Sequence, residues 1–109
     1  MTRFKWILPL LLWADTSSAQ SLFGEIRGLV TDSTGGAVKG ADIEATKTST
    51  NESRRALTGE DGAFSLINLD AGSYEVKVRK AGFRSAVTRN VVLRAREIAR
   101  VDAALEVAP

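Results

Sequence analysis

The chain has 109 residues, a net charge of +2, and neither histidine nor cysteine. The lack of both residue types excludes Ser-His-Asp and Cys-His nucleophiles, zinc sites with the usual ligands, and disulfide bonds. A near-neutral chain in which acidic and basic residues are interleaved also lacks the clustered basic face that nucleic-acid binding requires, so we predict no nucleic-acid partner.

The first 19 residues have the pattern of a secretory signal peptide. Arg3 and Lys5 precede the uncharged apolar run WILPLLLWA at 6–14, which is too short to cross a bilayer. The run SSA at 17–19 puts small side chains at the positions that signal peptidase inspects. We predict cleavage after Ala19, export to the periplasm, the outer membrane or the medium, and no transmembrane segment in the mature chain.

The first half of the mature chain predicts three strands. Residues 25–32 and 41–48 alternate apolar with polar side chains, and residues 54–58 form a shorter strand. The cluster DSTGG at 32–36 predicts a turn whose glycines supply positive φ, and the polar run 48–53 predicts a loop. The predicted inward side chains of the two longer strands are those of Ile26, Gly28 and Val30, then Ala41, Ile43 and Ala45.

The second half continues the alternation after the turn GEDG at 59–62. Strands are predicted over 63–69, over 74–79, in the segment that follows Phe83, and over 97–107. The alternation fails at Asn90 within the third of these. The predicted inward side chains are those of Phe64, Leu66, Tyr74, Val76, Val78, Val101, Ala103 and Leu105.

Strands that are apolar on one face can bury those faces only against one another. The sequence therefore predicts an all-β protein, an antiparallel two-sheet sandwich of about seven strands, with a barrel as the alternative architecture. The predicted organisation is a signal peptide at 1–19, a short linker at 20–24 and one domain at 25–107.

The order and spacing of several short motifs extend this prediction. The motifs are Ile26-x-Gly28-x-Val30-x-Asp32, Val38-x-Gly40-Ala41, Asp61-Gly62-x-Phe64-x-Leu66, Leu69-x-x-Gly72-x-Tyr74-x-Val76-x-Val78, Gly82-Phe83 and Arg100-Val101-Asp102-x-x-Leu105. In this respect the chain resembles the carboxypeptidase regulatory-like domains, whose fold is a transthyretin-like, or prealbumin-like, sandwich. The resemblance implies an extracytoplasmic module, either free-standing or the N-terminal part of a TonB-dependent or Oar-like outer-membrane receptor.

The remaining candidates for catalytic or metal-binding residues are polar residues in the turns. Glu60 and Asp61 could form an acid and base pair, but their place in a turn favours solvation and turn formation. The oxygen-rich runs 32–34 and 68–70 could contribute to a calcium site, but both fit Asx-type turns better. We therefore predict no catalytic, cofactor-binding or metal-binding residue, no cofactor and no enzymatic activity.

The predicted function is that of a non-catalytic exported module for structural support or protein interaction, with an envelope protein or the remainder of a receptor as partner. The alternative is a carbohydrate-binding module of the cell envelope. Such a site usually needs an exposed aromatic ring. The alternation places Phe64 and Tyr74 in the core, and Phe83 is also expected inside, so Phe23 is the candidate.

Overall fold

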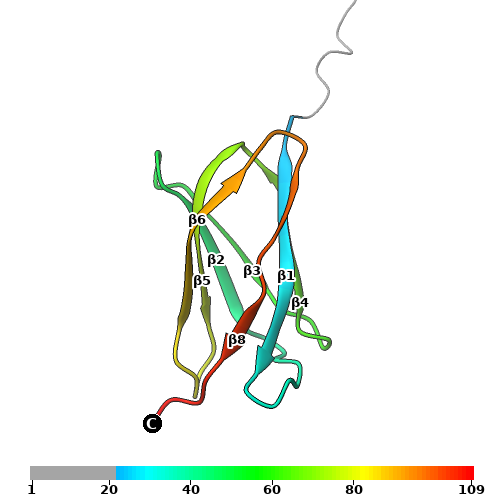
Figure 1. The fold of residues 1–109 in the computed structure, drawn as a ribbon, viewed down its shortest axis with the longest axis vertical. Coiled ribbons are helices and arrows are strands. Elements are labelled where there is room, and N and C mark those ends of the chain that lie inside the picture. Colours follow the sequence, from blue (N-terminus) through cyan, green and yellow to red (C-terminus); the bar gives the residue numbers. More distant parts are fainter. Residues whose placement is uncertain (1–21) are drawn as a thin grey trace, which may run out of the picture.

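The computed structural model describes residues 22–109, which form eight β-strands in two sheets and contain no helix (Figure 1). The predicted signal peptide lies outside these residues. The strands are β1 (Gly24–Asp32), β2 (Asp42–Lys47), β3 (Ser53–Leu57), β4 (Ala63–Leu69), β5 (Gly72–Arg79), β6 (Ala86–Leu93), β7 (Ile98–Arg100) and β8 (Ala103–Leu105).

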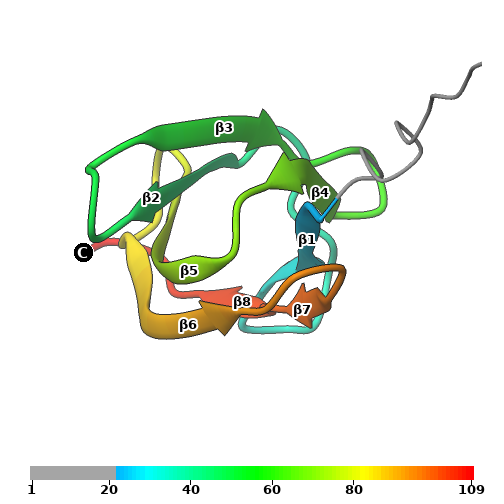
Figure 2. The ribbon, with the colours of Figure 1, turned by 90° about the horizontal axis from the view of Figure 1, so that it is seen from above.

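The strand order confirms the two-sheet sandwich. One sheet has the order β4-β1-β7, with β8 also paired to β1, and the other has the order β3-β2-β5-β6. The two sheets surround a single interior, with β3 beside β4 and β6 beside β7 and β8 (Figure 2). The segment predicted as one final strand at 97–107 is divided into β7 and β8. Both pair with β1 in parallel, whereas the other pairings are antiparallel.

Most core side chains are those that the alternation placed inward, and Val38, Leu69 and Leu93 are buried with them. Because successive residues of a strand point to opposite faces, every second side chain enters the interior. Val76 is fully buried and Tyr74 is 3% exposed, whereas Glu75 between them and Lys77 after Val76 are only partly buried. The predicted inward residues are buried apart from Ala103, which is partly buried, and Phe83 is also only partly buried against this core.

Local backbone geometry explains two irregular places in the sequence. In the turn at 32–36, Asp32 Oδ1 accepts hydrogen bonds from the Thr34 amide, the Thr34 hydroxyl and the Gly36 amide, and Gly35 has a φ of 88°. Asn90 has a φ of 59°, and the β5–β6 register shifts between Tyr74 and Val76. This shift is a β-bulge, and it accounts for the failure of the alternation at Asn90.

Candidate functional site

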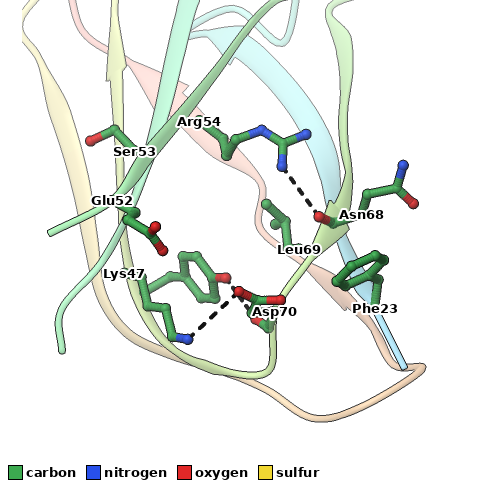
Figure 3. Close-up of a pocket in the computed structure, with 9 residues that line it drawn as sticks. Phe23, Lys47, Glu52, Ser53, Arg54, Asn68, Leu69 and Asp70 are labelled. Atoms are coloured by element: carbon green, nitrogen blue, oxygen red, sulfur yellow. Dashed lines mark hydrogen bonds and ion pairs between the residues drawn. The ribbon is translucent and has the colours of Figure 1, made fainter. Parts of the chain in front are cut away.

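A cleft of about 460 Å³ lies at the end of the sandwich where the described chain begins. It is built from the ends of β2 and β4, the starts of β3 and β5, and the residue before β1 (Figure 3). Its lining residues are Phe23, Lys47, Glu52, Ser53, Arg54, Asn68, Leu69, Asp70 and Tyr74. We call this concavity the end cleft.

Arg54, which lines this cleft, links the edge strands β3 and β4. These strands belong to different sheets and share no backbone pairing. The Arg54 guanidinium donates hydrogen bonds to the Ile67 carbonyl at 2.9 Å and to the Asn68 carbonyl at 3.2 Å (Figure 3). One side chain thus satisfies two acceptors on the neighbouring edge strand, using the several donors of a guanidinium.

Tyr74 forms the apolar floor of the cleft. Its ring is buried, and its hydroxyl donates a 2.6 Å hydrogen bond to the Asp70 carbonyl. Burial, followed by the nearby charge of Asp70, raises the pKa of Tyr74, so that the phenol remains a protonated donor. The core position predicted for Tyr74 is confirmed, and the ring offers no exposed platform.

Lys47 lies along one wall of the cleft, over Gly72. Its ammonium nitrogen is 4.0 Å from Asp70 Oδ2, and its side chain is only 17% exposed (Figure 3). Gly72 has a φ of 155°, and a Cβ at this position would lie 2.8 Å from Lys47 Cε. The positive φ favours glycine at this position, whereas the flexible end of the Lys47 side chain could move away from a Cβ.

Phe23 provides the aromatic surface at the rim. Its side chain is 48% exposed and stands near Asn68 and Asp70 (Figure 3). It also lines a second depression of about 370 Å³, which it shares with Glu25, Ile67 and other residues. The exposure anticipated for Phe23 is confirmed.

The other polar candidates occupy turns. Glu60 lies 3.5 Å from the ammonium of Lys39, and Asp61 Oδ1 accepts a hydrogen bond from the Ala63 amide. The Asp32 carboxylate is engaged within its own turn, as described above. Within residues 22–109, no group of three or more acidic, histidine or cysteine side chains is arranged to hold a metal ion, and no helix could span a membrane.

Sequence reasoning did not identify the roles of Arg54 and Asp102. Arg54 reads as the first residue of a short strand, and nothing local indicates that it reaches a strand of the other sheet. Asp102 accepts a hydrogen bond from the Leu29 amide at 2.9 Å, and this bond links β1 to the segment between β7 and β8. Asp102 belongs to the motif Arg100-Val101-Asp102, but its hydrogen-bond partner Leu29 is 73 residues away along the sequence.

The two-sheet architecture and the small polar end cleft define the class of this protein as a β-sandwich module. The carboxypeptidase regulatory-like domain family matches residues 25–106. The chain belongs to this family, and the resemblance noted in its motifs is confirmed. No curated protein sequence matches the chain significantly.

Solved structures share this fold at low sequence identity. The TIE protein of Bacillus anthracis has a TM-score of 0.67 and 21% identity, covering 96% of this chain and 18% of its own. Catechol 1,2-dioxygenase of Acinetobacter radioresistens has a TM-score of 0.66 and 12% identity, covering 86% and 55%. A type II cohesin–X-dockerin complex of Acetivibrio cellulolyticus contributes a chain with a TM-score of 0.61 and 18% identity, covering 75% and 56%. These similarities show the fold alone, and this chain corresponds to only part of each solved chain.

Proposed function

We propose that the protein is a non-catalytic exported module that supports a larger assembly or binds another protein in the cell envelope. The observation that carries this proposal is the path of the chain. Residue 22 lies at one end of the strands and Pro109 at the other (Figure 1). The two ends of this rigid sandwich therefore present separate loops and strand ends, which can contact different partners.

The lowered pKa values of three carboxyl groups support a non-catalytic role. Hydrogen bonds lower the pKa of Glu25, Asp32 and Asp102, each through groups of its own turn or sheet. A general acid at neutral pH needs the opposite displacement. The sequence has no histidine, so an iron site with histidine ligands cannot form in this chain.

We propose that the protein is located in the periplasm or the outer membrane. It is there either the N-terminal module of a TonB-dependent or Oar-like receptor or an independent protein. The predicted signal peptide and the family membership support this proposal. The test is expression of the full chain in a Gram-negative host, followed by fractionation and N-terminal sequencing. We expect a processed protein that begins at Gln20 in the envelope or periplasmic fraction. An unprocessed cytoplasmic chain would contradict export.

Protein interaction can be tested by photocrosslinking in the same cells. A photoreactive residue at Asn51, in the exposed loop between β2 and β3, samples one end of the module, and one at Ala81, between β5 and β6, samples the other. We expect a discrete cross-linked species containing a second envelope protein from at least one position. Cross-linking that is absent from both positions and from the remaining exposed turns would contradict the interaction role.

Carbohydrate binding in the end cleft is a second candidate, favoured by the half-exposed Phe23 ring beside the polar groups of Asn68 and Asp70. An aromatic face can stack on sugar C–H groups while an amide and a carboxylate bind hydroxyls. Titration calorimetry with neutral envelope oligosaccharides tests this candidate. We expect saturable binding that Phe23→Ala abolishes and that Leu57→Ala retains, since Leu57 is exposed but lies outside the cleft. Equal binding by both variants would exclude the cleft as the site.

A further inference from the structure

Half-exposed apolar side chains gather at the end of the sandwich where the described chain begins (Figure 1). Phe23, Ile67 and Ile98 are 48%, 53% and 55% exposed and line the same depression of about 370 Å³. Leu22 is 60% exposed and lies beside them, because its carbonyl accepts a hydrogen bond from the Arg96 amide, two residues before Ile98. We call these four side chains, of Leu22, Phe23, Ile67 and Ile98, the apolar patch.

The pairing of β1 with its two neighbours brings the patch together. Ile98 of β7 is the partner of Glu25 in β1. The register between β1 and β4 shifts at this point, so that Ile67 and Asn68 both lie opposite Glu25. Two isoleucines therefore flank Glu25 on the outer face of this sheet. Their exposed fractions show that no part of residues 22–109 covers them.

The charged groups around the patch leave a surplus of one positive charge. Two carboxylates line the depression, and each has an arginine partner: Glu25 with Arg27 at 2.9 Å, and Glu97 with Arg94 at 3.6 Å. Arg96 also lines the depression and is exposed, and its guanidinium has no ion pair within residues 22–109. Three cations against two anions give a net charge of +1, which attracts an anionic surface. The neighbouring end cleft does not change this balance, since it contributes two cations and two anions.

We propose that the apolar patch is a membrane-contact surface, which places this end of the module on a bilayer containing anionic phospholipid. Apolar side chains at such an end enter the boundary between head groups and acyl chains, and an arginine binds the phosphates. Glu25 between the two isoleucines already accepts hydrogen bonds from Ser65 and Arg27. A protein partner that covered the patch would desolvate this carboxylate, whereas water still reaches it at a bilayer interface.

The proposed export brings this end of the module to a membrane, and the choice of a bilayer as partner rests on that proposal. The apolar run of the predicted leader ends at Ala14, and seven residues separate it from Leu22. A chain of this length spans at most about 30 Å. While the leader occupies the bilayer, the apolar patch therefore lies close to the head groups. Cleavage after Ala19 removes the leader, so contact after processing depends on the folded module itself.

Vesicle flotation tests the proposal with the chain that begins at Gln20, expressed without the leader. This chain contains the whole buried core, which extends from Ile26 to Leu105, so it retains the fold. We expect it to float with vesicles of phosphatidylglycerol and phosphatidylethanolamine in equal amounts, and to float less with vesicles of phosphatidylcholine alone. Failure to float with either kind of vesicle would overturn the proposal.

Matched substitutions locate the contact. Ile67→Ser together with Ile98→Ser should lower the partition coefficient about tenfold or more, because two half-exposed apolar side chains no longer enter the bilayer. Leu22→Ser, which precedes the first strand, should also lower it and leaves the strand pairing untouched. Leu57→Ser is the control, since Leu57 is 67% exposed and lies outside both concavities. An equal loss of partitioning in the control would overturn the proposal.

Arg96→Gln tests the electrostatic part of the contact. One cation near an anionic surface changes binding by about fivefold. We therefore expect Arg96→Gln to lower the partition coefficient about fivefold with the phosphatidylglycerol vesicles and to leave it unchanged with phosphatidylcholine. An effect of the same size on both kinds of vesicle would overturn the role of Arg96.

Other occupants of the patch give different results. If the unchanged chain does not float but self-associates in sedimentation, and the two isoleucine substitutions abolish this association, the patch binds a second copy and the proposal is overturned. Photocrosslinks from Asn51 or Ala81 in a chain that does not float would overturn the membrane contact alone. Flotation of a chain that stays in the cytoplasm when expressed with its leader would instead contradict the proposed export and support the membrane contact.

Discussion

Thr58 is the buried polar residue within the core of the described chain, with a side chain that is satisfied on both sides. Its hydroxyl donates a 2.6 Å hydrogen bond to the Val38 carbonyl and accepts a 2.8 Å hydrogen bond from the Ala41 amide. These backbone groups lie in the segment between β1 and β2, so the hydroxyl fastens that segment to the residue that follows β3. The hydroxyl adds to two backbone hydrogen bonds, in which the Gly40 amide donates to the Thr58 carbonyl and the Thr58 amide donates to the Ala41 carbonyl.

Replacing Thr58 with valine keeps the shape of the side chain and removes the hydroxyl. We expect Thr58→Val to lower the free energy of unfolding by about 1 to 3 kcal/mol, because a buried amide and a buried carbonyl each lose a partner. Urea denaturation measures this difference. Thr58→Ser, which keeps the hydroxyl, should lose less stability than Thr58→Val, and the reverse order would show that the methyl group matters more than the hydrogen bonds.

The pairing of β1 with β7 and β8 depends on how closely two strands can approach. At Gly28 the neighbouring Val101 carbonyl occupies the space that a Cβ would need. A backbone atom in a paired strand cannot move aside as a flexible side chain can. The strands would therefore have to separate at this point to admit even a methyl group, and the Leu29 bond to Asp102 would be strained with them.

We therefore expect Gly28→Ala to destabilise the fold by about 3 kcal/mol or more, a large cost for one methyl group. Chemical denaturation or the melting temperature measures it. Gly59→Ala is the matched control, because its nearest neighbour is 3.5 Å away and its φ is not positive. Its effect should stay within about 1 kcal/mol. A similar loss in both variants would mean that the contact with Val101 is not the cause.

Many charged side chains of residues 22–109 form ion pairs at the surface, on the sheet faces and in the turns. On one face, Arg55 and Arg79 contact Asp42 and Glu44, all of them at least partly exposed. Exposed pairs of this kind contribute about 0 to 1 kcal/mol each. The stability of this small domain without disulfides therefore depends chiefly on its buried core.

Acid should nevertheless weaken the fold through three carboxyl groups. Hydrogen bonds lower the pKa of Glu25 (from Ser65, then Arg27), of Asp32 (from Thr34, then Gly36) and of Asp102 (from Leu29, then Arg100). Each group contributes stability that is complete above its ordinary pKa, 4.5 for glutamate and 3.8 for aspartate, and that is lost as the pH falls through the lower folded value.

The measurement is the urea midpoint across a pH series from neutral to strongly acidic. We expect the midpoint to fall with decreasing pH below these ordinary values. The triple variant Glu25→Gln, Asp32→Asn, Asp102→Asn should show a flatter profile over the same range. A midpoint that rises as the solution is acidified, or a triple variant that keeps the full slope, would contradict the assignment to these carboxyl groups.

The alternation of the sequence predicted most of the side chains that face the core and predicted that two sheets would bury them. It placed Tyr74 and Val76 inside correctly because side-chain direction in a strand is a local property with a period of two. The turn around Asp32 was likewise predictable, since its hydrogen bonds close within four residues. Phe23 lies near the predicted mature N-terminus, and its partial exposure agrees with that position.

Only the tertiary structure decided which strands are neighbours. Alternation specifies a face but no partner, so the parallel pairing of the last segment with β1, and its division opposite Gly28, could not be derived from it. The end cleft has the same origin, because its residues come from separate segments that meet only where the strands end. Arg54, in the end cleft, and Asp102, between β7 and β8, likewise acquire their roles only after the sheets have packed, since their partners are distant in sequence.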